Sequence, residues 1–232
     1  MTNTINTTFD CQVRRLGVMP YAEAWAMQEQ LAKLRGADEI PDTLLLVEHP
    51  HTYTLGTSAH DENLLFTLEQ LETYGIEVHW VNRGGDITYH GPGQLVGYPI
   101  IKLPAGADGL HADVIDYVRR LERTLIALLA TYDIRAYAYP SYTGVWLDSN
   151  GVPAKIAAIG VKVNTRRVTL HGFALNVNTD LDYFKGIIPC GIADKPVTSM
   201  QVVLDCPLDI AEVAARTANA FGAVFGKTMI PE

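Results

Sequence analysis

The sequence predicts an α+β fold in which helices flank a mixed or mostly antiparallel sheet. Segments with helical spacing of apolar residues and short apolar runs follow one another without the regular alternation of a parallel sheet. Two pairs of the apolar runs are joined by short polar turns, which favours antiparallel hairpins. A chain of 232 residues with 48% hydrophobic residues is long enough for one large domain. We therefore expect a disordered polar tail over residues 1–8 and a single domain over residues 9–232.

Four segments have the periodicity of amphipathic helices. The first spans residues 21–35 and meets a stop signal at Gly36. A short helix is predicted over residues 67–74, and the longest one over residues 111–131. A fourth helix, over residues 209–225, lies near the end of the chain.

Six apolar runs bounded by turn residues are predicted to be strands. They cover residues 44–48, 77–82, 95–103, 144–147, 154–163 and 168–176. Polar residues 148–151 and 164–167 separate the last three runs, so these runs are expected to form hairpins.

Residues 83–94 read Arg-Gly-Gly-Asp-Ile-Thr-Tyr-His-Gly-Pro-Gly-Gln, and they are the most unusual stretch of the chain. Glycine and proline disfavour both an ordinary helix and a continuous central strand. A polar loop between two strands, at one end of a sheet, is therefore expected. It is either a plain hairpin turn or the wall of a binding pocket. Charged and aromatic residues interleave with the glycines, which favours the pocket wall.

The charge balance and the N-terminal residues exclude several classes of protein. The formal net charge is −8, whereas nucleic-acid binding needs a basic face. The first fifteen residues lack the apolar core of a signal peptide, and no stretch is long enough to cross a membrane. We expect a cytoplasmic protein that binds neither nucleic acid nor membrane.

Of the three cysteines, Cys190 has the most suggestive setting. Cys11 and Cys206 have unremarkable neighbours, and reduced thiols are the simplest expectation for all three. Cys190 lies between a proline and a glycine, so we place it on a loop, as either a reactive thiol or a small buried hydrophobe. A reactive thiol needs a group that stabilises its thiolate or takes its proton. His90, His171 and Lys155 are the open candidates for that group.

A group of small residues follows Lys155 and recurs after His171. It comprises Ala157, Ala158, Gly160, Gly172 and Ala174. These residues either leave room for a slender apolar ligand or allow tight sheet packing.

Cofactor signals are absent. Residues 91–93 lack the third glycine of a dinucleotide fingerprint, and residues 226–228 are too close to the end for a phosphate loop. His49 and His51 have no nearby carboxylate or cysteine, so we expect neither a metal nor another cofactor. Chemistry without ATP is preferred.

Taken together, six segments resemble the octanoyltransferase (LipB) family. In chain order they read Glu-His-Pro…Tyr-Thr-Leu-Gly over residues 48–56, the glycine-rich stretch, Thr-Gly-Val-Trp over 143–146, Lys-Ile-Ala-Ala-Ile-Gly over 155–160, His-Gly-Phe-Ala-Leu-Asn over 171–176 and Pro-Cys-Gly over 189–191. The combination is highly specific and covers roughly residues 44–200, whereas the N-terminus and the last helix carry little of it.

The resemblance implies a fold like the catalytic domain of biotin and lipoate protein ligases, with residues 9–232 as one catalytic acyltransferase domain. It places the family's reactive cysteine and lysine on Cys190 and Lys155. The acyl-substrate-binding segments of the family fall on Arg83, Gly84, Gly85, Asp86, Ile87, Thr88, Tyr89, His90, Ala158, Ile159, Gly160, Gly172, Phe173 and Ala174. Asp86 and Ile87 occupy positions where the family tolerates variation.

The activity implied is transfer of an octanoyl or lipoyl group by a monomer, through an acyl thioester on Cys190. The donor is octanoyl-acyl carrier protein. The acceptors are lysine amines of lipoyl domains, in E2 subunits of 2-oxoacid dehydrogenases and in the glycine cleavage H protein. Lys155 lowers the pKa of the Cys190 thiol and carries the proton, and His90 orients the loop or the substrate.

Two other functions remain open from the sequence. One is an ATP-dependent lipoate–protein ligase on the same fold, which needs an adenylate site and no cysteine nucleophile. The other is a non-catalytic module that binds an acyl group or cofactor without turnover. Transfer without ATP separates the first alternative, and turnover separates the second.

Overall fold

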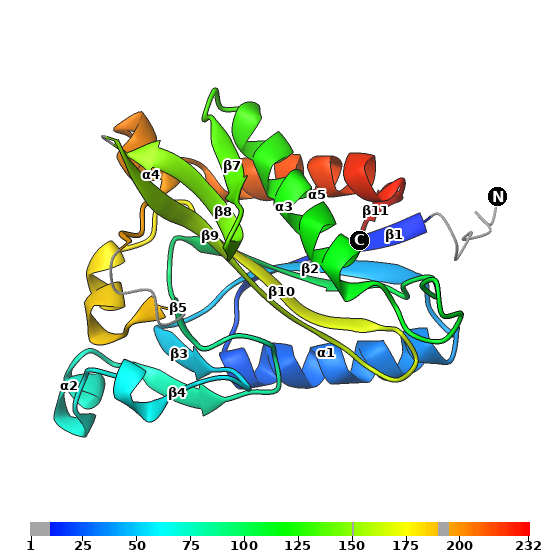
Figure 1. The fold of residues 1–232 in the computed structure, drawn as a ribbon, viewed down its shortest axis with the longest axis horizontal. Helices are drawn as coiled ribbons and strands as arrows, with labels where there is room; N and C mark the ends of the chain where they lie inside the picture. Colours follow the sequence, from blue (N-terminus) through cyan, green and yellow to red (C-terminus); the bar gives the residue numbers. More distant parts are fainter. Residues whose placement is uncertain (1–9, 150, 190–194) are drawn as a thin grey trace.

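A computed structural model of the chain describes residues 10–149, 151–189 and 195–232 (Figure 1). Its large sheet has eight strands: β1 (Asp10–Val18), β2 (Asp42–Glu48), β6 (Gln94–Ile100), β7 (Ala136–Tyr139), β8 (Tyr142–Ser149), β9 (Val152–Val163), β10 (Thr169–Asn176) and β11 (Thr228–Pro231). A second sheet has three strands: β3 (Thr52–Leu55), β4 (Glu77–Trp80) and β5 (Ile87–His90). The helices are α1 (Tyr21–Gly36), α2 (Leu68–Thr73), α3 (Val114–Ala130), α4 (Met200–Leu204) and α5 (Ile210–Phe225), with 3₁₀ turns η1 (Asp61–Asn63) and η2 (Leu181–Gly186).

The large sheet is mixed, in the order β11-β1-β2-β6-β10-β9-β8-β7. The pairs β11–β1 and β1–β2 are parallel, and every pair from β2 to β7 is antiparallel. The predicted hairpins β8–β9 and β9–β10 are both present. The α+β fold class with a mixed sheet and flanking helices is confirmed.

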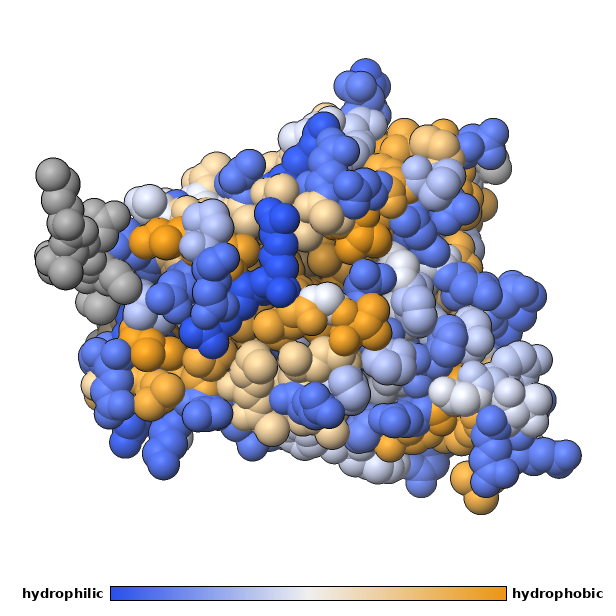
Figure 2. Space-filling view, turned by 180° about the vertical axis from the view of Figure 1, so that it is seen from behind, coloured by the Kyte–Doolittle hydropathy of each residue, from blue (hydrophilic) through white to orange (hydrophobic). Residues whose placement is uncertain are grey.

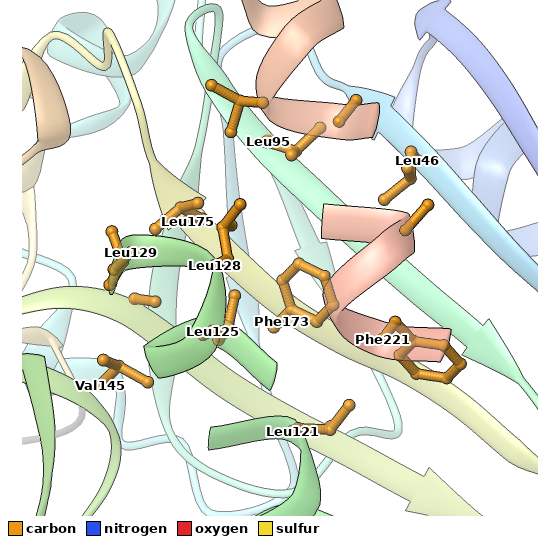
Figure 3. Close-up of a cluster of buried hydrophobic side chains, with 14 of the residues drawn as sticks. Leu46, Leu95, Leu121, Leu125, Leu128, Leu129, Val145, Phe173, Leu175 and Phe221 are labelled. Atoms are coloured by element: carbon orange, nitrogen blue, oxygen red, sulfur yellow. The ribbon is translucent and has the colours of Figure 1, made fainter. Parts of the chain in front are cut away.

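Helices cover both faces of the large sheet. α3 and α5 pack on one face, where leucines from α3 meet Phe173, Leu175 and Phe221 (Figure 3). α1 lies on the other face, and its Leu31 packs against Leu45 and Val96 (Figure 1). From behind, apolar patches on the surface are separated by hydrophilic side chains (Figure 2). The two largest groups of buried apolar side chains lie between the layers.

The helices begin directly after their capping residues, and these positions differ slightly from the helix ends predicted from the hydrophobic pattern. The helix predicted over residues 111–131 begins at Val114, because the Asp113 side chain accepts the Asp116 N–H as an N-cap. The C-terminal helix begins at Ile210 for the same reason, with Asp209 as its cap. The short helix predicted over residues 67–74 is capped by Thr67 and spans Leu68–Thr73.

Several strands were missing from the sequence prediction. β1, β3, β7 and β11 were not anticipated, and the glycine-rich stretch, expected to be a loop, contains strand β5. β5 pairs antiparallel with β3 at the edge of the small sheet. Its residues Ile87–His90 lie between the glycines, so that four ladder positions are free of glycine and proline.

Candidate functional site

The glycine-rich stretch folds back onto β9. Gly84 donates its N–H to the Val161 carbonyl oxygen at 2.9 Å. A Cβ atom on Gly160 would lie 2.9 Å from the Gly84 carbonyl oxygen, so the two backbones touch. Gly85 has a φ of +91°, which a glycine adopts readily. Glycine here both turns the loop and lets it lie directly on the sheet.

Arg83 fastens this loop to β3. Its side chain is buried, with Nη2 donating to the Thr54 carbonyl oxygen at 2.6 Å and to the Thr54 hydroxyl at 2.9 Å. Nη1 donates to the Gly84 carbonyl oxygen at 3.2 Å. The guanidinium therefore holds the start of the loop against the small sheet.

An apolar hollow opens between this loop, α1 and strands β6, β9 and β10. It encloses about 450 Å³ of atom-free space, part of it open to solvent. Its lining residues are Tyr21, Arg83, Gly84, Gly85, Thr88, His90, Val96, Tyr98, Ala158, Ile159, Gly160, His171, Gly172, Phe173 and Ala174. We call it the apolar hollow. The structure thus brings the three predicted substrate-binding segments together around one space.

Three of the predicted substrate-binding residues do not line the apolar hollow. Asp86 accepts hydrogen bonds from the Ile87 N–H at 2.7 Å and from the Asn63 amide at 2.5 Å. Ile87 is fully buried in the core of the small sheet. The Tyr89 hydroxyl lies 2.8 Å from His51 Nδ1. These three side chains support the loop and β5 from outside the hollow.

Both interpretations of the small residues apply, at different positions. Ala158, Gly160 and Ala174 line the apolar hollow, where a larger side chain would occupy its space. A Cβ atom on Gly172, by contrast, would overlap the Gly97 carbonyl oxygen on β6, so this glycine is also required by sheet packing. Ala157 belongs to the core on the α3 face.

Phe173 contributes to the hollow while its ring lies in the core. It is grouped with Leu125, Leu128 and Phe221 on the α3 and α5 face (Figure 3). Ala174, the next residue along β10, packs on the α1 face instead.

Lys155 lies on β9 in a second, smaller hollow. Its side chain is buried, and Nζ lies 4.8 Å from the centre of the Trp146 ring on β8, a cation–π distance. The residues lining this lysine hollow are Thr88, Gln94, Lys155, Ala158, Ala174, Asn176, Phe184, Pro189 and Val197. Thr88, Ala158 and Ala174 line both hollows, which are therefore neighbours with a common wall.

Lys155 also borders an open groove on the outer side of the loop. Gly84, Gly85 and Gly160 line this groove from one side, and Tyr142 and Thr143 belong to its lining as well. Lys155 therefore lies between the lysine hollow and a groove that is open to solvent.

Cys190, the predicted nucleophile, lies outside the described residues, as do residues 191–194. Pro189, directly before it in the sequence, lines the lysine hollow. Beyond residue 194, the Pro196 carbonyl oxygen accepts the Lys155 N–H at 2.9 Å. Among the three candidate partners for the thiol, Lys155 lines the hollow that Pro189 lines, whereas His90 and His171 line the apolar hollow.

The other two cysteines have no comparable setting. Both are free thiols, as expected. Cys11 is fully buried, and burial raises the pKa of its thiol to about 12, with the Asp42 charge adding to the effect. Cys206 is exposed on a separate part of the surface.

The histidines around the apolar hollow are held neutral. Burial lowers the pKa of His90 well below its usual value, and the neighbouring His49 adds to the shift. Burial also lowers the pKa of His171 to about 3 and that of His49 to about 4. At neutral pH these rings are hydrogen-bonding groups without charge.

Sequence reasoning missed three residues of the hollow wall. Tyr21 comes from the first turn of α1 and stacks on His90 with ring centres 5.7 Å apart. Val96 and Tyr98 come from β6, two positions apart on one face of that strand. This spacing was visible in the sequence, but an apolar run buried on both faces does not reveal which face borders a cavity.

His49 and His51 form hydrogen bonds with groups of the chain itself. His49 Nδ1 donates to the Met19 carbonyl oxygen at 2.7 Å, and its Nε2 lies 2.8 Å from the Tyr98 hydroxyl. Within residues 10–149, 151–189 and 195–232, no group of three or more histidine, cysteine or acidic side chains is arranged to hold a metal ion. None of the helices in these same parts is long and apolar enough to span a bilayer.

The sequence matches a known family over most of its length. The lipoyl protein ligase A/B catalytic domain matches residues 20–222, and the chain belongs to this family. The octanoyltransferase of Rubrobacter xylanophilus is 48% identical over 92% of this chain and 93% of its own length. That of Acidothermus cellulolyticus is 50% identical over 85% of this chain and 84% of its own. The resemblance to octanoyltransferases, and with it the prediction of an acyltransferase enzyme, is confirmed.

Solved structures show the same fold at low sequence identity. The bi-partite lipoate protein ligase of Thermoplasma acidophilum aligns with a TM-score of 0.73 and 15% identity, over 97% of this chain and 87% of that one. Lipoate-protein ligase A bound with ATP gives a TM-score of 0.69 and 16% identity, over 96% of this chain and 90% of that one. The predicted likeness to ligase catalytic domains is confirmed. The relatives and the fold together support lipoyl or octanoyl transfer in lipoylation.

Proposed function

We propose that this chain transfers an octanoyl group from acyl carrier protein to a lysine amine of lipoyl domains, through an acyl thioester on Cys190. The observation that carries the proposal is the common wall of the two hollows. A slender apolar chain in the apolar hollow would place its carbonyl end at Thr88, Ala158 and Ala174, beside Lys155 and Pro189. Cys190 is the next residue in the sequence.

The first step exchanges one thioester for another. The Cys190 thiolate attacks the donor carbonyl, its C–S bond forms, and the bond to the carrier sulfur breaks. The protonated Lys155 amine gives its proton to the departing carrier thiolate. One C–S bond forms and one breaks, and a thioester replaces a thioester of similar energy, so no ATP is needed.

The second step converts the thioester into an amide. The acceptor amine enters by the open groove and attacks the octanoyl carbonyl, and the Cys190 thiolate departs. Lys155, neutral after the first step, takes the proton that the attacking amine loses. The enzyme returns to its starting state with Lys155 protonated.

The acceptors we propose are lipoyl domains of the E2 subunits and of the glycine cleavage H protein. In this proposal the chain is one catalytic domain and acts as a monomer in the cytoplasm. His90 takes part by orienting the loop or the acyl group, and the neutral state of its ring supports this role.

Intact mass after incubation with octanoyl-acyl carrier protein, without ATP, tests the proposal. The protein should gain the mass of one octanoyl group, and peptide mapping should place it on Cys190. Cys190→Ser should give no thiol-linked adduct. Cys206→Ser removes an exposed thiol and should keep the adduct.

Three outcomes would contradict the proposal. An adduct on Cys11 or Cys206 would make the assignment of the nucleophile wrong. Acyl transfer only from free octanoate with ATP would identify a ligase. Tight binding of octanoate with neither adduct nor turnover would identify a non-catalytic module.

A further inference from the structure

A line of hydrogen bonds joins the apolar hollow to the strand that carries Lys155. It passes through Gln94 on β6 and Asn176 on β10, whose side chains are 1% and 4% exposed. Both residues line the lysine hollow. The mechanism above gives neither of them a role.

Backbone carbonyls fix the direction of every bond in this line. Asn176 Nδ2 donates to the Thr198 carbonyl oxygen at 3.0 Å, so Asn176 Oδ1 is the acceptor for Gln94 Nε2 at 2.9 Å. Gln94 Nε2 also donates to the Tyr89 carbonyl oxygen at 3.1 Å. The Gln94 amide therefore cannot be turned around without losing two bonds. Its Oε1 must be the atom 2.9 Å from His90 Nδ1.

The proton of the His90 ring is thereby assigned to Nδ1. An oxygen that only accepts requires Nδ1–H as its donor, which leaves Nε2 of a neutral ring with a lone pair. His90 Nε2 lies 3.5 Å from the Thr54 hydroxyl. The Thr54 oxygen already accepts from Arg83 Nη2 at 2.9 Å, so the hydroxyl hydrogen is available for His90.

The groups packed around His90 favour the same neutral ring. Tyr21 stacks on it with an interplanar angle of 17°, and His49 meets it edge-on at 5.7 Å. His49, Arg83 and His171 all lower the pKa of His90 in addition to burial, and the Gln94 bond acts in the opposite direction.

The other end of the line is attached to Lys155 itself. The Thr198 N–H donates to the Lys155 carbonyl oxygen at 2.9 Å, and the Lys155 N–H donates to the Pro196 carbonyl oxygen at 2.9 Å. A single chain of polar contacts thus runs from the loop at Arg83, through His90, to the backbone of the proposed proton carrier.

We propose that Gln94 and Asn176 are positioning residues, which hold His90 as the neutral Nδ1–H tautomer and align the wall of the apolar hollow with Lys155. The kinetic part of this assignment rests on the proposed acyl transfer. The tautomer does not, because it follows from the contacts of the side chains alone.

Gln94→Glu tests the assignment with a side chain of the same shape. The carboxylate can still accept from His90 Nδ1, but it places an oxygen against the Tyr89 carbonyl and Asn176 Oδ1. We expect the His90 ring to gain a second proton, seen as imidazolium in ¹⁵N–¹H spectra of the ring, and acyl-enzyme formation to slow about 10-fold or more. The wild-type spectrum should show one ring proton, on Nδ1.

Asn176→Asp provides a second variant in case Gln94→Glu does not fold. It keeps the acceptor for Gln94 but loses the donor to Thr198, so acyl-enzyme formation should slow while the His90 tautomer stays. Asn178→Asp is the matched control. Asn178 bridges the Leu208 backbone at 2.8 Å and 2.9 Å and lines neither hollow, so the rate and the His90 signals should be unchanged.

Each remaining outcome would overturn either the roles proposed for Gln94 and Asn176 or the proposed acyl transfer. A wild-type ring protonated on Nε2, or a Gln94→Glu variant with unchanged ring signals and rate, would overturn the assignment. For Gln94→Glu, loss of stability with a parallel loss of rate, but no change in the ring, would make the network merely structural and overturn it too. The predicted tautomer in a wild-type protein that never forms an acyl adduct would instead overturn the proposed function.

Discussion

The two hollows contain buried basic side chains of opposite character. Around the apolar hollow, His49, His90 and His171 have neutral hydrogen-bonding partners, and burial lowers their pKa values. In the lysine hollow, Lys155 lies against the π-electrons of the Trp146 ring, which attract a cation. Burial alone therefore does not identify a catalytic base. The contacts of each basic side chain must be considered as well, because they distinguish the neutral histidines from Lys155.

This difference separates the three candidates for activating the thiol. His171 Nε2 lies 2.9 Å from the Asn82 side-chain oxygen, and His90 Nδ1 is bonded to Gln94. Both rings are occupied in holding the wall of the apolar hollow. Lys155 borders both the smaller hollow and the open groove, which is the position that the proposed role of proton carrier requires.

The largest expected effect comes from changing Lys155. If this change had no effect on acyl transfer, the contrast between the two hollows would be wrong. Lys155→Ala should slow acyl-enzyme formation by about 10²- to 10⁴-fold, since it removes a proton carrier and a positive charge. Lys155→Arg keeps the charge but cannot release a proton. Alkylation of the Cys190 thiol should therefore stay faster in the Arg variant than in the Ala variant, while acyl transfer is slow in both.

Lys162 offers a matched control on the same strand. It lies on β9, is half-buried and lines none of the three spaces described above. Lys162→Ala should transfer octanoyl groups at the wild-type rate. Equal rates for the two alanine variants in single-turnover mass measurements would remove Lys155 from the mechanism.

A smaller effect, on stability, is expected from a change at Gly172, which lines the apolar hollow. Gly172, next to His171, lies where a Cβ atom would overlap the Gly97 carbonyl oxygen and lie 2.8 Å from Pro99 Cδ. Gly172→Ala should lower the free energy of unfolding by about 1–3 kcal/mol, because the strands β6 and β10 must move apart. Urea unfolding measures this loss.

Gly84→Ala serves as the control for that change. Its added carbon would meet only the Val161 carbonyl oxygen, at 3.4 Å, an ordinary contact. The two variants should differ clearly in unfolding free energy. If they do not, Gly172 is required by the ligand and not by sheet packing.

The sequence predicted the local elements well and the long-range arrangement poorly. The periodicity of α1, α3 and α5 and the hairpins β8–β9–β10 depend on neighbouring residues, and all were predicted. β7 pairs with the next strand along the chain, β8, and was missed although that pairing is local. β1 and β11 depend on pairing between distant segments; Cys11, for example, pairs with both Met229 and Asp42. Local propensity carries no information about such partners.

The same distinction applies to the candidate site. The segments at Arg83, Lys155 and Gly172 were found because glycine, a buried lysine and small residues are unusual within apolar runs. Gln94 and Asn176 belong to segments that the sequence singled out but were given no role of their own, because a polar residue at the end of a strand is common. Their bond spans 82 positions in the chain, and only the fold brings them together.

The dependence of stability on pH tests the neutral state of the histidines directly, through a change in slope of about one proton. The pKa of His49 is about 4 in the folded protein, below its ordinary value of 6.5, and that of His171 is about 3. Below pH 6.5 the unfolded chain therefore binds protons that the native state does not. Stability is fully present above pH 6.5 and is lost as pH falls toward 4, by about 1 kcal/mol per pH unit for each histidine.

His49→Asn should flatten this slope by about one proton when urea unfolding is followed from pH 7 to pH 5. The variant also loses the bond to Tyr98, so its stability at pH 7 should be lower, and the slope rather than the absolute value is the readout. A wild-type slope in the His49 variant would mean that this ring is charged in the native state, and the contrast between the two hollows would then fail.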